Sequence, residues 1–372
     1  MSIDVLSDRR RAVPSVLFVQ NRTHRAGAQT CLVRLLQTRE IQQRNPALLC
    51  SPGGWLVEEA MRHGVEVLQE KFNRSRSIVS RLYGNAAFAR RTVRELKSRG
   101  IRPVIVQAND HTEGLLALET AKLIVARSAI CLRSPTMTRD DYFKYRCHHF
   151  DFVSAVGDDI HRRAQSWDPG REIALIHDGI LKEELETVKP KATNVPRRVL
   201  VIGSPIDWKG WADLTEALFR LEQEGVLPAM QFDFTGVQPD RSRNDLKLER
   251  LRAARCTFLG RVDKFRDLVV SYELAINPSR METFGMAAIE VLAAGIPLLS
   301  SRTGVMEQVQ EISSMLFDPG QPEQLAAALK RLLRDWPALD FGVDRCQDNI
   351  RRRFLIDYSA RRLESAYVQL LA

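Results

Sequence analysis

Residues Ala275–Val305 read A-I-N-P-S-R-M-E-T-F-G-M-A-A-I-E-V-L-A-A-G-I-P-L-L-S-S-R-T-G-V, a pattern typical of a short strand, a tight loop, a helix, a Gly-x-Pro stop and a second strand. Glu282 stands at the junction of loop and helix, and Glu290 follows eight residues later. The free N–H groups and positive dipole of a helix start favour an anion, and Gly285 lets the backbone approach it closely. Because glutamates also accept hydrogen bonds from hydroxyls, the stretch predicts a site for a nucleotide-sugar, which carries both a diphosphate and hydroxyls.

The same glutamates have a simpler interpretation. A glutamate near a helix N-terminus stabilises the helix by about 0.3–1 kcal/mol without any ligand. The complete string E-T-F-G-M-x-x-x-E-x-x-A-x-G-x-P, from Glu282 to Pro297, is more specific. It resembles the signature of glycosyltransferase family 4, which are retaining enzymes of the GT-B fold. The resemblance is strongest over residues 199–309 and weaker over residues 16–180.

The resemblance implies a role for each residue of this string. Glu282 would contact hydroxyls of the transferred sugar, and Glu290 would hold the ribose diol. The diphosphate would be held by the backbone amides of four consecutive residues, Thr283, Phe284, Gly285 and Met286. Glu307 also fits the family pattern, but we interpret it as structural.

A second segment, Val201–Leu214, reads V-I-G-S-P-I-D-W-K-G-W-A-D-L and resembles the first strand and loop of the family's donor-binding domain. There an arginine and a lysine five positions apart usually clamp the donor diphosphate. Lys209 occupies the lysine position, whereas Ser204 stands where the arginine is expected. A solvated loop lysine is the alternative for Lys209. The segment that ends at Val262 resembles the one whose backbone contacts the nucleobase.

No Asp-x-Asp sequence occurs in the chain, although glycosyltransferases of the other major fold use one to hold a divalent cation on the diphosphate. A helix N-terminus and Lys209 would replace the metal here. We therefore expect a metal-independent hexosyltransferase without a cofactor.

The hydrophobic pattern predicts two α/β domains with parallel sheets. We expect an N-terminal Rossmann-like domain over residues 1–184, a linker over 185–196 and a C-terminal nucleotide-sugar-binding domain over 197–352. By the GT-B resemblance, an amphipathic helix over 353–372 would return to the first domain. The expected strands lie near residues 16–19, 47–50, 104–106, 129–132, 152–156 and 173–176 in the first domain, and near 199–202, 230–234, 257–259, 274–276 and 298–299 in the second.

Candidate residues in the first domain are less specific. Gly27 lies in a segment that resembles the family's Gly-rich loop, which faces the donor. His111 follows a predicted strand, at the end of the strand where ligands bind in such sheets. Arg133 stands where several relatives carry a histidine, and its planar guanidinium suits an acceptor phosphate or the transferred sugar. Asp178 replaces the asparagine of the family's Asn-Gly turn near the hinge.

For the mechanism, the resemblance implies retention at the anomeric carbon by a front-face reaction. The departing diphosphate oxygen would take the acceptor's proton, while Lys209 and the helix amides stabilise its charge. No carboxylate can be identified from the sequence as the nucleophile of a double displacement. An inverting reaction with Asp110 or His111 as base stays an alternative.

Charge is concentrated in one segment. Residues Lys71–Arg102 contain ten basic residues and one acid, a net charge of +9, which equals the net charge of the whole chain. Apolar residues recur at helical spacing within it, so we expect a basic amphipathic helix that docks on an anionic membrane surface, the alternative being a solvated helix whose apolar face is core. Few aromatic residues accompany the charge, and no nucleic-acid-binding module is present.

Composition supports a cytoplasmic location. Six scattered cysteines show no Cys-x-x-Cys pair, and no apolar run approaches a membrane span or signal peptide. We therefore predict a peripheral, retaining glycosyltransferase on the inner face of the cytoplasmic membrane. It would transfer a sugar from a nucleotide-sugar, with UDP-sugars favoured, to a glycolipid or lipid-linked saccharide of envelope polysaccharide assembly. The competing hypothesis is a non-catalytic GT-B protein that binds nucleotide-sugar or glycan for a partner.

Overall fold

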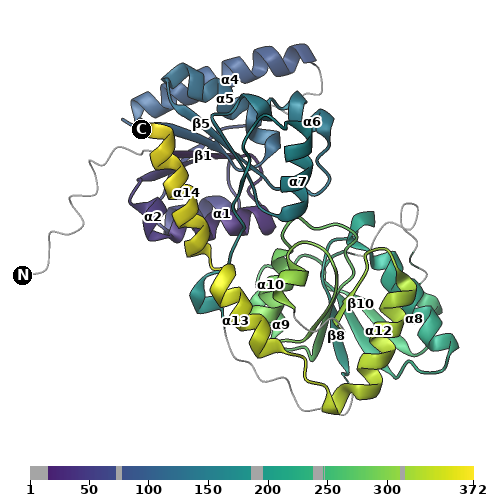
Figure 1. Ribbon diagram of the computed structural model, residues 1–372. Helices are drawn as coiled ribbons and strands as arrows, with labels where there is room; N and C mark the ends of the chain where they lie inside the picture. Colours follow the sequence, from purple (N-terminus) through teal and green to yellow (C-terminus); the bar gives the residue numbers. More distant parts are fainter. Residues whose placement is uncertain (1–15, 73–77, 186–195, 238–245, 247, 311–314) are drawn as a thin grey trace, which may run out of the picture. The chain divides into compact units, whose positions relative to one another are not determined.

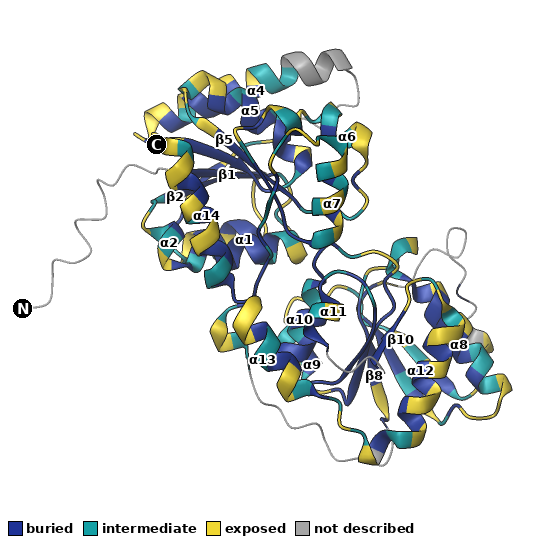
Figure 2. Ribbon diagram, viewed as in Figure 1, coloured by how far each residue is buried: buried dark blue, intermediate teal, exposed yellow. Residues whose placement is uncertain are grey.

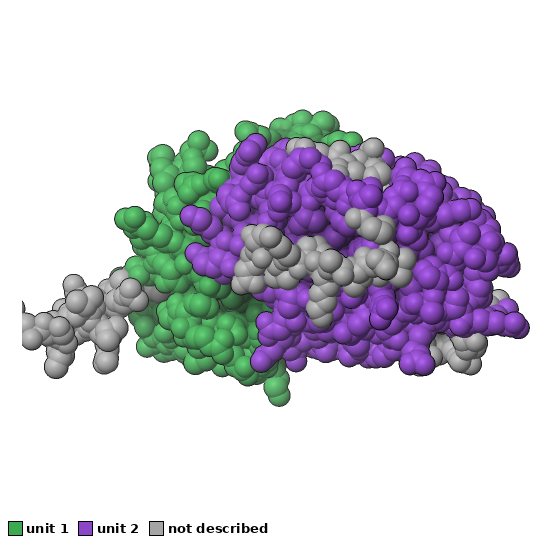
Figure 3. All heavy atoms as spheres, turned by 90° about the horizontal axis from the view of Figure 1, so that it is seen from below, with its two compact units in different colours: residues 1–179, 356–372 green, residues 180–355 purple. Residues whose placement is uncertain are grey.

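The computed structural model describes residues 16–72, 78–185, 196–237, 246, 248–310 and 315–372. The chain forms two compact units, one of residues 1–179 with 356–372 and one of residues 180–355 (Figure 3). The predicted linker at 185–196 falls almost wholly outside the described residues. None of the helices in the described part of the chain has both the length and the apolar character that a membrane span requires.

The first unit is built on a seven-stranded parallel sheet in the order β3-β2-β1-β4-β5-β6-β7. Its strands are β1 (Val16–Gln20), β2 (Pro46–Cys50), β3 (Glu66–Gln69), β4 (Ile105–Ala108), β5 (Arg127–Leu132), β6 (Phe152–Ala155) and β7 (Ala174–Leu175). Four central strands, β1, β2, β4 and β5, are buried along almost their whole length, as expected for a sheet covered on both faces (Figure 2). The apolar patterns had predicted six of these strands, and β3 was missed because only its two central residues are apolar.

Helices cover both faces of this sheet (Figure 1). They are α1 (Gly27–Gln37), α2 (Arg39–Gln42), α3 (Trp55–Arg62), α4 (Ile78–Ser98), α5 (Gly114–Ile124), α6 (Arg139–Lys144), α7 (Asp158–Trp167) and α14 (Ile356–Leu371), with short 3-10 turns η2 (His111–Glu113) and η3 (Cys147–His149). Helix α4 packs on α5, whereas α1 packs on α3 and α14.

The C-terminal helix α14 belongs to the first unit, as the GT-B resemblance implied. Its buried face includes Leu363 and Tyr367, and it packs on α1 and α2. The Tyr367 hydroxyl donates a hydrogen bond to Gln107 in β4, and Arg44 forms an ion pair of 2.7 Å with Glu364. Apolar burial and these polar contacts together hold the end of the chain on the first unit.

The second unit has a six-stranded parallel sheet in the order β10-β9-β8-β11-β12-β13. Its strands are β8 (Arg198–Val201), β9 (Met230–Phe234), β10 (Ala254–Phe258), β11 (Leu274–Asn277), β12 (Leu298–Ser301) and β13 (Leu316–Phe317). Its helices are α8 (Trp211–Gln223), α9 (Phe265–Val269), α10 (Met286–Ala293), α11 (Met306–Val309), α12 (Pro322–Asp335) and α13 (Val343–Arg353), with 3-10 turns η4 (Lys182–Glu184), η5 (Asp207–Lys209), η6 (Leu248–Arg250) and η8 (Trp336–Ala338). The two-residue strand β13 is the one that the apolar pattern did not predict.

Each sheet therefore has a point at which the strand order reverses. In the first unit, β1 and β4 are neighbours, and the strands that follow them, β2 and β5, lie on opposite sides of this pair. In the second unit, β8 and β11 have the same relation. Ligands of doubly wound folds bind at the carboxyl ends of such strand pairs. We call these places the first and the second switch point.

Candidate functional site

The second switch point brings Lys209 and Glu282 together from two loops. Lys209 ends η5 after β8, and Glu282 lies in the loop between β11 and α10. The Lys209 Nζ and Glu282 Oε1 atoms are 2.5 Å apart, and the exposed fractions of the two side chains are 16% and 15%. Ser279 Oγ donates to the same carboxylate oxygen at 2.8 Å. The two residues that the sequence singled out separately thus form one half-buried ion pair.

Backbone and side-chain contacts fix these two loops against each other. The Arg280 N–H donates to the Trp208 carbonyl oxygen at 2.8 Å. The Arg280 guanidinium also grips the Asp213 carboxylate in the first turn of α8, at 2.7 and 2.5 Å. The hydrogen bonds that Arg280 donates to Asp213 raise the pKa of the guanidinium. Arginine and carboxylate match in such a two-point contact, which fixes orientation as well as distance.

Gly210 marks the closest approach between the two loops. Its φ of 68° lies in the left-handed region, and a Cβ built there would lie 1.8 Å from the Pro278 carbonyl oxygen. No side chain fits in that space. The glycine after Lys209 is therefore needed both for the positive φ and for the close contact between the two loops, which fixes the position of the Lys209 backbone.

Helix α10 begins at Met286, directly after this ion pair. Gly285 is its N-cap residue with a φ of 92°. The segment is also held from the β12 side, because the Val305 N–H donates to the Phe284 carbonyl oxygen at 3.1 Å. The N-terminal end of a helix favours an anion, so this end of α10 suits an anion beside Lys209. Within α10, Glu290 is half-buried one turn further on.

The other predicted donor residues follow the carboxyl ends of strands in the same sheet. Ser204 is exposed in the loop after β8, and Val262 is half-buried in the loop after β10. Gly236, which follows β9, passes so close to the Trp211 ring that a Cβ would lie 3.0 Å from it. All of the predicted donor residues of the second unit follow β8, β10 or β11, at the carboxyl ends of these parallel strands.

The first switch point is a buried polar network. His111 Nδ1 lies 2.9 Å from Asp110 Oδ1, and both follow β4. Although burial lowers it, the hydrogen bond and charge of Asp110 raise the pKa of His111. Burial raises the pKa of Glu113 to about 7, and the charge of Asp110 adds to the shift. Glu113 also accepts a hydrogen bond of 3.1 Å from the Asn21 N–H in the loop that leads from β1 to α1.

Arg133 is paired inside the first unit, and its predicted contact with an acceptor phosphate or the transferred sugar stays a prediction. Its side chain is 8% exposed and forms a two-point ion pair with Asp178 at 2.6 and 2.5 Å. Its Nε donates to Asn109 Oδ1 at 3.1 Å. A buried arginine needs its charge compensated by such partners. Gly27, the remaining candidate of this unit, is exposed and begins α1 after the Ala26 cap.

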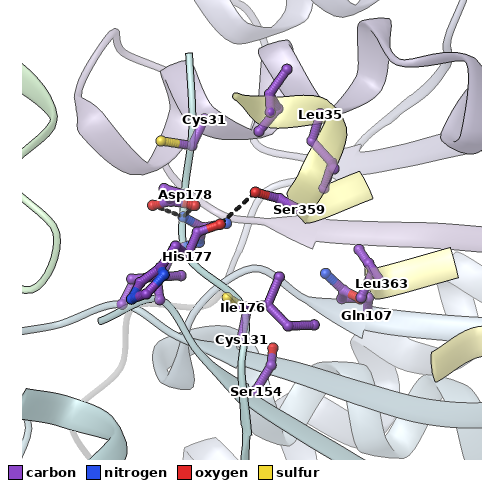
Figure 4. A pocket seen from close by; sticks show the side chains of 13 residues that line it. Cys31, Leu35, Gln107, Cys131, Ser154, Ile176, His177, Asp178, Ser359 and Leu363 are labelled. Carbon is purple, nitrogen blue, oxygen red and sulfur yellow. Dashed lines mark hydrogen bonds and ion pairs between the residues drawn. The ribbon is translucent and has the colours of Figure 1, made fainter. Parts of the chain in front are cut away.

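A small cavity lies beside this Arg133–Asp178 pair (Figure 4). Ser359 of α14 closes one side, and its hydroxyl donates to the His177 carbonyl oxygen. The cavity volume is about 20 Å³, which suits one water molecule. Nucleotide-sugars need several hundred cubic ångströms, so this cavity is not their site.

The basic segment has only part of the predicted character. In the described part of α4 the apolar residues are core, with Phe88, Val93 and Leu96 at most 8% exposed. The amphipathic helix was therefore predicted correctly, but this part of it has no apolar face left for a membrane. The basic residues Arg90, Arg94 and Lys97 are exposed. The side chains of residues 73–83 lie outside the described set.

Metal and cysteine chemistry add no further site in the described part of the chain. No three His, Cys, Asp or Glu side chains are grouped there as a metal site requires. All six cysteines are free, and five of them are buried.

Sequence reasoning missed two features of these sites. The Arg280–Asp213 pair joins positions 67 residues apart, and nothing in either local sequence indicates the partner. The sequence analysis did not single out Glu113, although the apolar residues that follow it indicate that this turn is buried.

Comparison with known proteins finds a family model that matches part of the second unit. Residues 196–335 match the model of the family Glycosyl transferases group 1. The structure of HepE from Anabaena in complex with UDP and glucose superposes with a TM-score of 0.76 at 16% identity, covering 95% of this chain and 99% of that one.

Two curated relatives match shorter parts. An uncharacterized glycosyltransferase of Methanocaldococcus jannaschii is 31% identical over 114 residues, 30% of this chain and 29% of that protein. The GDP-mannose-dependent alpha-(1-6)-phosphatidylinositol dimannoside mannosyltransferase of Mycobacterium tuberculosis is 31% identical over 172 residues, 46% of this chain and 38% of that protein. The matches thus span about a third of these relatives' lengths. The chain has the GT-B fold, and its residues 196–335 are similar to the glycosyl transferases group 1 family.

Proposed function

We propose that this protein is a glycosyltransferase that moves a hexosyl group from a nucleotide-sugar to a saccharide acceptor. One observation carries the proposal. Lys209, Glu282 and the first turn of α10 meet at the second switch point, inside the domain that matches the family model. A cation and the N-terminal end of a helix suit a diphosphate, and a carboxylate suits sugar hydroxyls.

The residues have distinct proposed roles. Lys209 and the amides of residues 283–286 hold the diphosphate and stabilise the charge that develops on it as the sugar leaves. Glu282 orients the sugar, and Glu290 holds the ribose. Ser204, Val262 and Gly27 are further proposed donor contacts, and His111 stays a candidate on the acceptor side.

The stereochemistry and metal requirement are finer proposals that rest on the family 4 resemblance. Retention by a front-face reaction requires no protein nucleophile, because the leaving diphosphate oxygen takes the acceptor's proton. Lys209 and the α10 amides occupy the place of a divalent cation. Measuring the anomeric configuration of the product by NMR, with and without EDTA, tests both. An inverted product or a lost rate with EDTA would contradict them.

The donor base is proposed as uracil, with guanine as the alternative. HepE has been solved with UDP, whereas the Mycobacterium tuberculosis relative depends on GDP-mannose. A thermal-shift screen against UDP, GDP, ADP and their sugar conjugates separates these bases, because binding to the folded state stabilises it by mass action.

A glycolipid or lipid-linked acceptor of envelope polysaccharide assembly, at the inner face of the cytoplasmic membrane, is proposed from the exposed basic side chains of α4. With the described apolar face buried, such binding would be electrostatic. Vesicles containing anionic lipid should then retain the protein at low salt and release it at high salt. Equal binding to neutral vesicles would contradict this proposal.

The decisive experiment for the function is donor turnover. Wild-type protein should hydrolyse or transfer sugar from the nucleotide-sugar that stabilises it, and Glu282→Gln should lose most of this activity while retaining its fold. Binding without turnover, unaffected by Glu282→Gln, would instead favour a non-catalytic GT-B protein that presents nucleotide-sugar to a partner.

A further inference from the structure

The Lys209–Glu282 ion pair bears on the relative affinity of the proposed site for donor and for product. Lys209 has one described ion-pair partner, Glu282, at 2.5 Å, and its ammonium also lies 4.6 Å from the centre of the Trp208 ring. The carboxylate receives Lys209 and Ser279 on the same oxygen, Oε1. No hydrogen bond from the described residues reaches the second oxygen, Oε2.

We propose that Glu282 competes with the diphosphate for Lys209, so that the site discriminates against the nucleoside diphosphate product and in favour of the nucleotide-sugar donor. The proposal rests on the proposed function of this site and adds the order of preference between its two ligands.

The physical argument starts from the unliganded pair. A diphosphate that enters beside Lys209 must draw the ammonium away from a carboxylate or share it with one. Both side chains are about 15% exposed, so water screens their attraction less than at an open surface. The negative charge of Glu282 also repels the anion. When the nucleoside diphosphate binds without a sugar, this loss of attraction and this repulsion weaken its binding in full.

The sugar of the intact donor offsets the cost. Its hydroxyls can donate to Glu282, and the carboxylate then exchanges one set of donors for another. Hydrogen bonds to a charged acceptor are stronger than those between neutral groups. When the sugar has left with the acceptor, Glu282 loses these donors and regains Lys209, which favours release of the diphosphate.

The two loops around the ion pair are held in place, so the exchange of partners requires only side chains to move. The Arg280–Asp213 contact and the close approach of Gly210 to Pro278 hold the two loops together whether or not Lys209 touches Glu282. The lysine side chain, with its rotatable bonds, is the part that can move.

The test is a calorimetric comparison of UDP with UDP-glucose, or of GDP with GDP-mannose if the uridine pair does not bind. Glu282→Gln keeps the shape of the side chain and removes its charge. We expect it to bind the nucleoside diphosphate about three- to tenfold tighter than wild type, and to bind the nucleotide-sugar no tighter. The preference for donor over product should collapse.

The matched control is Glu307→Gln, which changes the net charge equally in the same unit. Glu307 is exposed and paired with Arg302 at 3.3 Å, so the control should leave both affinities unchanged. A second comparison repeats Glu282→Gln in a Lys209→Met background. The gain for the diphosphate should shrink there, because no lysine remains to be released, whereas simple repulsion by Glu282 would leave it as large.

The outcomes are distinguishable. Unchanged or weaker diphosphate binding by a folded Glu282→Gln variant, or a gain independent of Lys209, overturns the exchange and leaves the glycosyltransferase proposal standing. If wild-type protein binds neither nucleotide pair, the proposed function fails, and the exchange fails with it.

Discussion

The two switch points share a topology and differ in how their charges are satisfied. At the first, Arg133 and Asp178 are buried and bound to each other, and Asp110, His111 and Glu113 form a buried network. At the second, Lys209 and Glu282 retain partial exposure and lie beside the start of α10. Equivalent places in two doubly wound sheets therefore differ here in how deeply their charged pairs are buried. We propose that the greater exposure of the Lys209–Glu282 pair lets the second switch point accept a ligand.

The largest expected effect concerns the buried pair of the first unit. Arg133→Met leaves Asp178 as an uncompensated buried charge, and breaking such a pair costs about 3–5 kcal/mol of unfolding free energy. Urea denaturation measures this loss, and nucleotide affinity should stay unchanged at a temperature where the variant is folded. The control is Arg127→Met, whose side chain is 57% exposed. It should cost less than about 1 kcal/mol.

The double variant Arg133→Met with Asp178→Asn sharpens this prediction. Replacing both charges removes the unpaired ion, so the double variant should lose less stability than either single change. A double variant as destabilised as the sum of the singles would mean that the pair is not what holds this region.

At the second switch point, Gly210→Ala should be nearly as disruptive. Gly225 provides a matched control, because its φ is also 68° but a Cβ there would meet nothing within 4 Å. Gly225→Ala thus reports the backbone strain alone, whereas Gly210→Ala adds the clash with Pro278. We expect Gly210→Ala to cost about 1–3 kcal/mol more, measured by urea denaturation, and to weaken nucleotide binding. Equal effects of the two changes would show that the close approach is not required.

Lys209→Met tests the chemistry rather than the stability of the second switch point. Removing one preorganised charge from a transition state typically lowers the rate about 100-fold or more. Transfer activity should fall by this amount, while the exposed Lys264→Met in the same unit leaves it unchanged. Full activity of Lys209→Met would return this lysine to an ordinary loop position.

The smallest predicted effect is the pH dependence of the first network. The folded state raises the pKa of Glu113 from 4.5 to about 7, so its contribution to stability is present below pH 4.5 and is lost as pH rises through 7. His111, with a pKa raised above 6.5, loses its contribution in the same direction. Stability should therefore fall between pH 5 and pH 8.

Glu113→Gln should flatten this slope. Its Tm relative to wild type should be higher at pH 8 than at pH 5 by about 3 °C or more. Glu119→Gln, on the exposed side of α5, should keep the wild-type profile. A slope that persists in Glu113→Gln would assign it to other groups.

Much of the fold could be predicted from the sequence, because buried parallel strands are short apolar runs that stand out between helices. The strands that escaped, β3 and β13, have two buried apolar residues each, too few for a pattern. Glu282, Lys209 and Gly285 could be chosen as donor-site candidates because they lie in dense local motifs, and their role stays a proposal.

Pairings across the chain were not predictable in this way. Arg133 looked like a free phosphate-binding arginine because its partner, Asp178, lies 45 residues away. The apolar face of α4 looked available to a membrane because sequence spacing does not say what covers a helix. In both cases the partner of a side chain is set by the tertiary fold, which the local sequence does not show.

The central claim is that the second switch point, and not the first, holds the donor. Hydrogen exchange with and without saturating nucleotide-sugar tests it most directly. The account predicts slower exchange of amides in residues 203–211 and 279–290 on binding, and no such change in residues 203–211 with Lys209→Met. Protection confined to the first unit, with residues 279–290 unaffected, would contradict it.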